Sequence, residues 1–213
     1  MDNVLILGSG LSGIGACKLA INKNLNIRVS DSNKILRKNK VLFKKFNVSW
    51  EEGQHSISHL DWADYIIKSP GISNQIDLIK IARAKKIPVI SEIEFAYRYV
   101  NNSKIIAVTG SNGKTTTSKL IYHILKQSGF EVEICGNSFS SSFSEKINFS
   151  PSQYYVLELS SFQLENITQF KPDISILLNL SPDHLDRYDF DADQYYNTKM
   201  KIQSNQKKDN FFI

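Results

Sequence analysis

Short apolar runs alternate with longer amphipathic stretches along almost the whole chain. Short apolar runs bounded by polar residues or glycine are typical of buried strands, and the longer stretches between them are typical of helices. The predicted strands cover residues 3–7, 26–30, 64–68, 88–90, 104–108, 131–135, 154–159, 173–178 and 210–213. The predicted helices cover residues 12–24, 35–46, 76–86, 91–100, 114–127 and 191–205.

This alternation predicts an α/β fold, because strands separated by helical crossovers pair in parallel. The pattern starts again after a polar break at residues 101–103. We therefore expect a Rossmann-like parallel sheet in an N-terminal domain over residues 1–95, followed by a P-loop-like domain over residues 96–213. The last predicted strand runs to the final residue, so we expect the sequence to be part of a longer protein, with its second domain incomplete.

Composition places the chain among folded proteins. Hydrophobic residues make up 41% and charged residues 22% of the 213 residues, which argues against disorder. The apolar runs are far shorter than the ~20 residues that cross a bilayer, and the N-terminus lacks the basic start of a signal peptide. Cys17 and Cys135 have neither metal-site nor disulfide spacing, so we expect two buried thiols in the cytoplasm.

The net charge of +5 is uneven. Residues 1–100 contain 15 Lys and Arg against 9 Asp and Glu, whereas residues 101–213 contain 11 against 12. The excess is densest between residues 34 and 45, which could attract an anionic ligand but more often marks a solvated helix face, the interpretation we favour. The chain has no nucleic-acid module and no aromatic residues interleaved with this basic run, so we expect no nucleic-acid partner.

A first glycine-rich loop, GSGLSG at residues 8–13, follows a predicted strand and opens a helix. Asp31 stands at the end of the next strand. Glycines let a phosphate approach the backbone, the helix N-terminus attracts it, and the acid can bind a sugar hydroxyl. The pattern predicts a nucleotide-like ligand. A tight turn without a ligand and an NAD-dependent dehydrogenase are the alternatives.

A second glycine-rich loop, TGSNGKTTT at residues 109–117, is the strongest local signal. The wider P-loop pattern fails, because Val108 stands where it requires glycine, but a shorter variant fits. Backbone amides of such a loop cradle phosphates, Lys114 would hold the β- and γ-phosphates, and the Thr115 hydroxyl would bind Mg²⁺. The residues predicted to bind the triphosphate are Gly110, Ser111, Asn112, Gly113, Lys114, Thr115 and Thr116.

Glu158 is the predicted second magnesium ligand. It stands at the end of a predicted strand and interrupts the apolar run at residues 156–159. A surface acid is the alternative, but an acid within an apolar strand needs a partner, and carboxylate oxygens suit Mg²⁺.

Three separated motifs together resemble the Mur ligases of peptidoglycan synthesis. They are residues 109–117, LELSSFQLE at 157–165 and NLSPDHLDRY at 179–188. The loop and the DHLD element are also shared with folylpolyglutamate synthases. The SSFQLE and DRY elements, together with SPG at residues 69–71, are similar to the branch that adds D-glutamate.

The resemblance implies an ATP-dependent, Mg²⁺-using cytoplasmic ligase with UDP-N-acetylmuramoyl-L-alanine and D-glutamate as substrates. ATP would phosphorylate the L-alanyl carboxylate, and the D-glutamate amine would then attack the acyl phosphate. The resemblance also implies a monomer that touches no membrane and a missing third domain, so we expect this chain alone to be inactive. A folate-type ligase and an NAD-binding module remain alternatives.

The resemblance also implies roles for single residues. Lys114, His184 and Lys199 would act in catalysis, with His184 near a second Mg²⁺. Lys199 matches a lysine that the family carbamylates, and in that form it would serve the metal site. Asn137 matches a substrate contact. Without the resemblance, His184 would be a turn residue and Lys199 a solvated helix lysine. The residues implied for the uridine diphosphate are Leu11, Ser12, Asp31, Ser32 and Gly71.

The chain departs from the family pattern at two places. Ser138 and Phe139 stand where the family usually has Ile-Gly, so we expect a different substrate loop. Ser32 and Asn33 follow Asp31 where the family often has Thr-Arg, so a nucleotide-contacting arginine is missing there.

Overall fold

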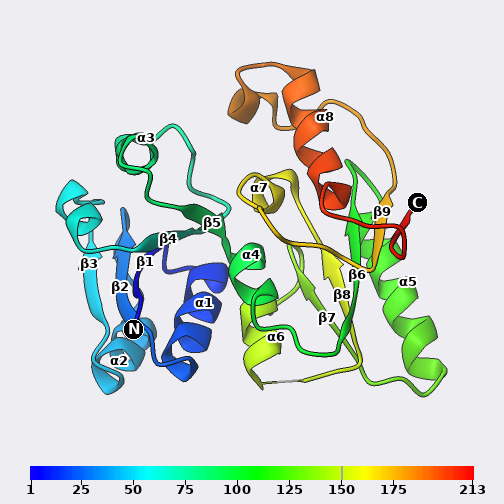
Figure 1. The fold of residues 1–213 in the computed structure, drawn as a ribbon, viewed down its shortest axis with the longest axis horizontal. Coiled ribbons are helices and arrows are strands. Elements are labelled where there is room, and N and C mark those ends of the chain that lie inside the picture. Colours follow the sequence, from blue (N-terminus) through cyan, green and yellow to red (C-terminus); the bar gives the residue numbers. More distant parts are fainter. Residues whose placement is uncertain (150) are drawn as a thin grey trace.

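A computed structural model describes residues 1–149 and 151–213 and contains two parallel five-stranded sheets (Figure 1). The predicted α/β fold is therefore confirmed. The first sheet has the order β3-β2-β1-β4-β5 and consists of β1 (Asn3–Leu7), β2 (Asn26–Asp31), β3 (Ser49–Glu52), β4 (Tyr65–Lys68) and β5 (Val89–Ser91). The second has the order β10-β9-β6-β8-β7 and consists of β6 (Lys104–Thr109), β7 (Val132–Gly136), β8 (Tyr154–Glu158), β9 (Ile174–Leu177) and β10 (Phe211–Phe212).

The order of the first sheet reverses between β1 and β4. These strands pair in parallel with Leu7 beside Lys68, so the loops that follow them leave the sheet side by side. The crevice at such a reversal is where open α/β sheets bind ligands. The glycine-rich loop at residues 8–13 and the SPG turn at residues 69–71 thus share one edge.

The second sheet places β6 between β8 and β9. Val108 pairs with Glu158 and Thr109 pairs with Leu177. The carboxyl ends of three neighbouring strands therefore bring together the second glycine-rich loop, Glu158 and the segment that follows β9.

Helices connect most of the strands. The α-helices are α1 (Leu11–Asn22), α2 (Arg37–Lys45), α3 (Asp77–Ala84), α4 (Glu92–Tyr97), α5 (Lys114–Gln127), α6 (Phe143–Phe149), α7 (Ser161–Leu164) and α8 (Ala192–Met200). The 3₁₀ helices are η1 (Ile57–Asp61), η2 (Leu185–Tyr188) and η3 (Lys201–Gln203). Among the described residues, none of the helices combines the length and apolarity that crossing a membrane requires.

Besides the 3₁₀ helices η1 and η2, the strand β3 and the helices α6 and α7 were not predicted. The strand β3 has the polar sequence SWEE at a sheet edge, and α6 is a short helix after a serine run, with Phe143 and Ile147 as its one apolar i, i+4 pair. The single turn of α7 begins with a capping box between Ser160 and Gln163, which satisfies backbone groups that so short a helix leaves open. The predicted helix over 191–205 was too long, because α8 tightens into η3 after Met200. The proposed domain boundary after residue 95 falls within α4.

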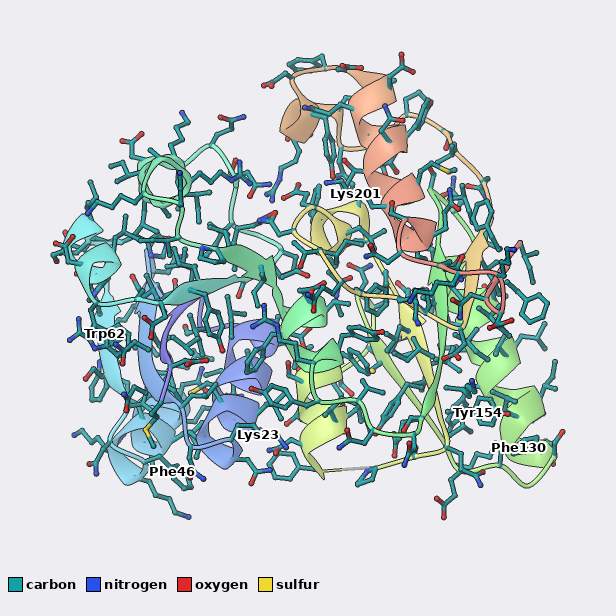
Figure 2. The ribbon with its side chains drawn as sticks, viewed as in Figure 1. Lys23, Phe46, Trp62, Phe130, Tyr154 and Lys201 are labelled. Atoms are coloured by element: carbon teal, nitrogen blue, oxygen red, sulfur yellow. The ribbon has the colours of Figure 1, made fainter. Side chains whose placement is uncertain are left out.

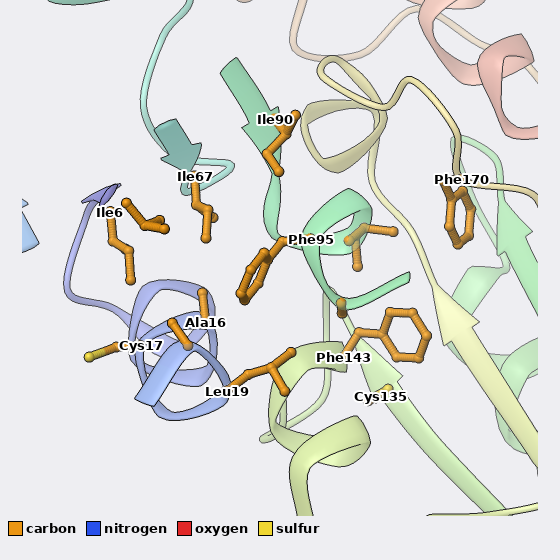
Figure 3. Close-up of a cluster of buried hydrophobic side chains, with 14 of the residues drawn as sticks. Ile6, Ala16, Cys17, Leu19, Ile67, Ile90, Phe95, Cys135, Phe143 and Phe170 are labelled. Atoms are coloured by element: carbon orange, nitrogen blue, oxygen red, sulfur yellow. The ribbon is translucent and has the colours of Figure 1, made fainter. Parts of the chain in front are cut away.

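One apolar cluster runs from the first sheet through α1, α4 and α6 into the second sheet (Figure 3). Phe95 of α4 and Phe143 of α6 are fully buried in it. At Gly15 of α1, an added Cβ atom would lie 1.9 Å from the Ser142 hydroxyl oxygen, so a larger residue would displace the Ser142 side chain at the N-terminal end of α6. The two sheets consequently share a continuous core.

The basic run at residues 34–45 lies on the surface. Only Asn39 and Phe43 of α2 are buried, and Lys40 pairs with Glu52 at 2.7 Å. Phe46, which follows α2, lies at the outer margin of the molecule in Figure 2. The preferred interpretation of a solvated helix face is confirmed, as is the burial of the free thiols of Cys17 and Cys135.

The buried carboxyl group of Glu92 joins α4 to α6. It accepts a hydrogen bond from the Ser144 amide at 2.5 Å, and its Oε2 atom has no hydrogen-bond partner among the residues that the structure describes. Burial raises the pKa of this carboxyl group from 4.5 to about 7, although hydrogen bonds from Ser144 partly oppose the shift.

This raised pKa predicts a specific dependence of stability on pH. The folded state holds the Glu92 proton more tightly than the unfolded state. The contribution of Glu92 to the free energy of unfolding is therefore complete below about pH 4.5 and is lost as pH rises through about 7. Glu92→Gln imitates the neutral acid and should remove this loss, about 2–3 kcal/mol of unfolding free energy. Denaturant titrations of both proteins at pH 5 and pH 8 test this. An equal change in unfolding free energy between the two pH values in both proteins would contradict this role of Glu92.

Candidate nucleotide and catalytic site

The second glycine-rich loop connects β6 to α5 and is held by the segment after β9. The Ser111 amide donates to the Asn179 carbonyl at 3.0 Å, and the Asn112 amide donates to Oδ1 of Asn179 at 2.9 Å. Gly113 precedes α5 with a φ of +86°, a value that suits glycine. The first amides of the 14-residue helix lack intrahelical acceptors and form its positive end, so this loop can bind an anion.

Lys114 lies across the loop. Its Nζ atom donates to the carbonyl oxygens of Gly110 and Ser111, each at 2.8 Å. The side chain is therefore held over the loop and does not extend into solvent. In this position its amine can contact the oxygens of a phosphate bound to the loop.

Glu158 is completely buried at the end of β8. Its Oε2 atom accepts a hydrogen bond from the Thr115 hydroxyl at 2.7 Å, and its Oε1 atom accepts from Asn137 Nδ2 at 3.1 Å and the Ser138 hydroxyl at 2.6 Å. All three of these donors are neutral groups. The alternative of a surface acid is wrong, and the hydroxyl and carboxylate oxygens of Thr115 and Glu158 fit the preference of Mg²⁺.

Lys199 of α8 is 2% exposed and donates to the Gly110 carbonyl at 2.9 Å. The alternative of a solvated helix lysine is therefore wrong. Burial, followed by the neighbouring charge of Lys114, lowers the pKa of Lys199 to about 8, and the charge of Asp183 partly opposes the shift. A substantial fraction of this amine is neutral near pH 8, the form that can react with carbon dioxide.

His184 is exposed, unlike Glu158 and Lys199. Its side chain is 60% exposed, its Nε2 atom is 3.5 Å from Oδ2 of Asp183, and its ring lies 5.3 Å from that of Phe162. It stands in the left-handed region at the start of η2 without capping the turn through its side chain. Within the described part of the chain, no three His, Cys, Asp or Glu side chains gather to hold a metal.

A cleft of ≈ 300 Å³ separates the loops of the two sheets. Leu11, Ser12 and Gly71 line it from the first sheet, and Asn137 lines it from the second. The structure thus brings together four residues that the family resemblance associates with the substrate.

Asp31 and Ser32 do not line this cleft. The Asp31 carboxylate accepts hydrogen bonds from the Ser9 amide and hydroxyl, both at 2.7 Å, and from the Asn33 amide. Burial alone would raise its pKa, but these hydrogen bonds hold the pKa of Asp31 below its usual value. Asp31 therefore supports the glycine-rich loop directly.

Sequence reasoning missed several residues of the site. Ser138 was noted only as a departure from the family pattern, yet it binds Glu158. Tyr195 was not singled out, although its hydroxyl lies 3.2 Å from that of Ser111. Glu165 and Arg187 lie inside the recognised motifs without an assigned role. The motifs were the available signal, because periodicity does not reveal contacts between distant segments.

Comparison with known proteins shows the family of the chain. Residues 2–91 match the N-terminal domain of MurD-like Mur ligases, and residues 108–213 match the Mur ligase middle domain. The chain belongs to the Mur ligase family. It is 46% identical over its whole length to the UDP-N-acetylmuramoylalanine--D-glutamate ligase of Bacteroides fragilis, and 44% identical over 99% of its length to that of Porphyromonas gingivalis. The chain spans about half the length of these relatives, 48% and 46% respectively.

Solved structures support the same fold. The whole chain aligns with 70% of UDP-N-acetylmuramate:L-alanyl-gamma-D-glutamyl-meso-diaminopimelate ligase from Neisseria meningitides, with a TM-score of 0.65 at 17% identity. It also aligns over 96% of its length with 47% of UDP-N-acetylmuramate-alanine ligase from Thermotoga maritima, with a TM-score of 0.55 at 24% identity. At these identities the likeness concerns the fold alone.

The turn that carries Asn137 gives a test of the site's construction. An added Cβ atom at Gly136, where φ is +115°, would lie 2.1 Å from the Glu158 carbonyl oxygen. At Gly129 φ is +85° but the space is open. We expect Gly136→Ala to lower the unfolding free energy by at least ~3 kcal/mol and Gly129→Ala by about 1 kcal/mol, as measured by urea denaturation. Equal losses would contradict this account of the turn.

Proposed function

We propose that the chain carries the ATP site and the UDP-sugar site of a ligase that adds D-glutamate to UDP-N-acetylmuramoyl-L-alanine. The loop at residues 109–116 binds ATP, and the cleft beside Gly71 binds the uridine diphosphate of the second substrate. We further infer a cytoplasmic setting, with which the two free, buried thiols agree.

One observation carries this proposal: Asn137 belongs to both sites. Its side chain donates to Glu158 beside the phosphate loop, and the same residue lines the cleft with Leu11 and Gly71. A substrate that fills the cleft therefore reaches the edge of the triphosphate site, as transfer of a phosphoryl group between the two ligands requires.

The proposed reaction has two steps. A carboxylate oxygen of the L-alanyl group attacks the γ-phosphorus of ATP, forming an acyl phosphate and releasing ADP. The amino nitrogen of D-glutamate then attacks the acyl carbon, an amide forms, and phosphate leaves. Both steps bring anions together, so preorganised positive charge lowers their barriers.

Several residues of the chain would supply this positive charge and bind the phosphates. Lys114 and the amides at the start of α5 hold the β- and γ-phosphates, and the buried amine of Lys199 adds positive potential when protonated. Thr115 and Glu158 would hold Mg²⁺, which neutralises phosphate charge when bound. His184 is assigned to the edge of the site, where its exposed ring can approach a bound ligand.

The alternatives are less well supported. A MurD-like match for residues 2–91 argues against an NAD-binding module, although this family and dinucleotide enzymes use similar glycine-rich loops. Calorimetry with UDP-N-acetylmuramoyl-L-alanine and, separately, with NADH distinguishes them. We expect heat of binding only with the UDP-sugar; selective binding of NADH would overturn the assignment of the first site.

Lys114 provides the direct test of the ATP site. Lys114→Met should weaken binding of Mg·ATP by at least about tenfold, because it removes a charge-assisted contact to the phosphates. Lys119→Met is the matched control, since Lys119 is an exposed lysine on the same helix. Calorimetry should show unchanged affinity for the control. Equal ATP affinities for both variants would end the assignment of Lys114.

Carbamylation of Lys199 can be tested independently of turnover. Lys199 and Lys68 are both buried amines with a pKa of about 8, but only Lys199 lies beside the phosphate loop. With ¹³C-labelled bicarbonate, NMR should show a carbamate signal that Lys199→Met removes and Lys68→Met retains. Absence of the signal from the unsubstituted chain, or its survival in Lys199→Met, would refute the carbamylated form.

A further inference from the structure

A buried charged cluster joins the two sheets near the cleft. Glu165, which follows α7, accepts hydrogen bonds from Arg187 at 2.9 Å on each carboxylate oxygen and pairs with Lys68 of β4 at 3.3 Å. The three side chains are 7%, 12% and 1% exposed, in that order. Because burying a charge is costly unless it is paired, removing one member leaves the others poorly compensated.

Arg187 also donates hydrogen bonds to the backbone of the first domain. Its Nη2 atom donates to the carbonyl oxygens of Pro70 at 3.0 Å and Ile72 at 2.7 Å, and its Nη1 atom donates to that of Gly71 at 3.4 Å. The two hydrogens of Nη2 serve three acceptors, Pro70, Ile72 and Glu165, so one hydrogen is shared between two of them. A planar guanidinium can combine such contacts with a bidentate carboxylate pair, whereas a lysine cannot. One side chain from η2 thus fixes three successive carbonyl groups of the turn after β4.

The turn held in this way forms one wall of the cleft. Pro70 and Gly71 line the cleft, whereas Arg187 does not. Since the peptide bond is planar and trans, the Gly71 amide points opposite to the Pro70 carbonyl and therefore away from Arg187. Arg187 thereby orients the turn from the side that faces away from the cleft, and it does not line the space that a ligand would occupy.

Other contacts hold the opposite side of the domain junction. Lys18 of α1 pairs with Glu145 of α6 at 2.6 Å, and Asn22 donates to Asn148 at 2.7 Å. Together with the apolar core, these contacts keep the domains attached when Arg187 is removed. Loss of the arginine is therefore expected to loosen the cleft rather than to separate the domains.

We propose that Arg187 is a positioning residue, which through Glu165 locks the turn at residues 70–72 to the second domain and so sets the geometry of the uridine-nucleotide cleft. The part of the proposal that concerns the nucleotide rests on the proposed function. The locking of the domains does not, and it can be measured without a ligand.

The test measures the distance between the domains. Spin labels on Lys80→Cys in α3 and Asp193→Cys in α8 occupy exposed positions, and the native thiols are buried, so labelling is selective. Pulsed electron resonance should give a narrow distance distribution for the otherwise unsubstituted chain. Arg187→Ala should broaden it, Arg187→Lys should restore part of the order, and the exposed-pair control Lys85→Ala should leave it unchanged.

Calorimetry on the same variants compares their affinities for the two ligands. A general loss of structure would lower both affinities, whereas loss of the positioning role lowers only one. If one molecule in ten keeps the binding geometry, Arg187→Ala weakens binding of UDP-N-acetylmuramoyl-L-alanine about tenfold, while affinity for Mg·ATP stays unchanged. A distribution as narrow as that of the unsubstituted chain overturns the proposal, as does an equal loss of affinity for both ligands. If Arg187→Ala does not fold, Arg187→Lys decides by the same criteria. Failure of the unsubstituted chain to bind the UDP-sugar would refute the proposed function while the distance measurement still tests the lock.

Discussion

The continuous apolar core through α1, α4 and α6 is the constraint on which the rest of the molecule depends. Each parallel sheet carries its loops at the carboxyl edge, but two such edges make one cleft only if their sheets are held at a fixed distance and angle. Phe95 and Phe143 fill the junction, and Gly15 lets α1 approach α6 closely. The close-packed junction gives little room for independent movement at its base.

Polar contacts then fix the positions of individual loops on the domains that the core holds together. The Arg187–Glu165 pair and its carbonyl contacts orient the turn after β4, whereas Asn137 and Ser138 connect the cleft to Glu158. The core is non-directional and fixes the approach of the domains. Hydrogen bonds from charged and amide groups are directional, so they fix individual loops.

Much of the fold follows from local pattern, because buried strands and amphipathic helices have distinct periods. The adjacency of Thr115 and Glu158 was predictable in the same way, since both follow neighbouring parallel strands at one edge. The burial of Lys199 was not, because its helix is polar and only the contact with Gly110 shows which face is covered. The role of Arg187 depends on residues more than a hundred positions away, which no local pattern reports.

In the proposed function, a triphosphate on the loop at residues 109–116 and a UDP-sugar in the cleft occupy adjacent sites that meet at Asn137. A crystal structure with a non-hydrolysable ATP analogue, Mg²⁺ and UDP-N-acetylmuramoyl-L-alanine tests it most directly. The account predicts phosphates over the amides of α5, the metal between Thr115 and Glu158, and the UDP-sugar against Leu11 and Gly71. A triphosphate bound elsewhere, or a UDP-sugar outside the cleft, would contradict it.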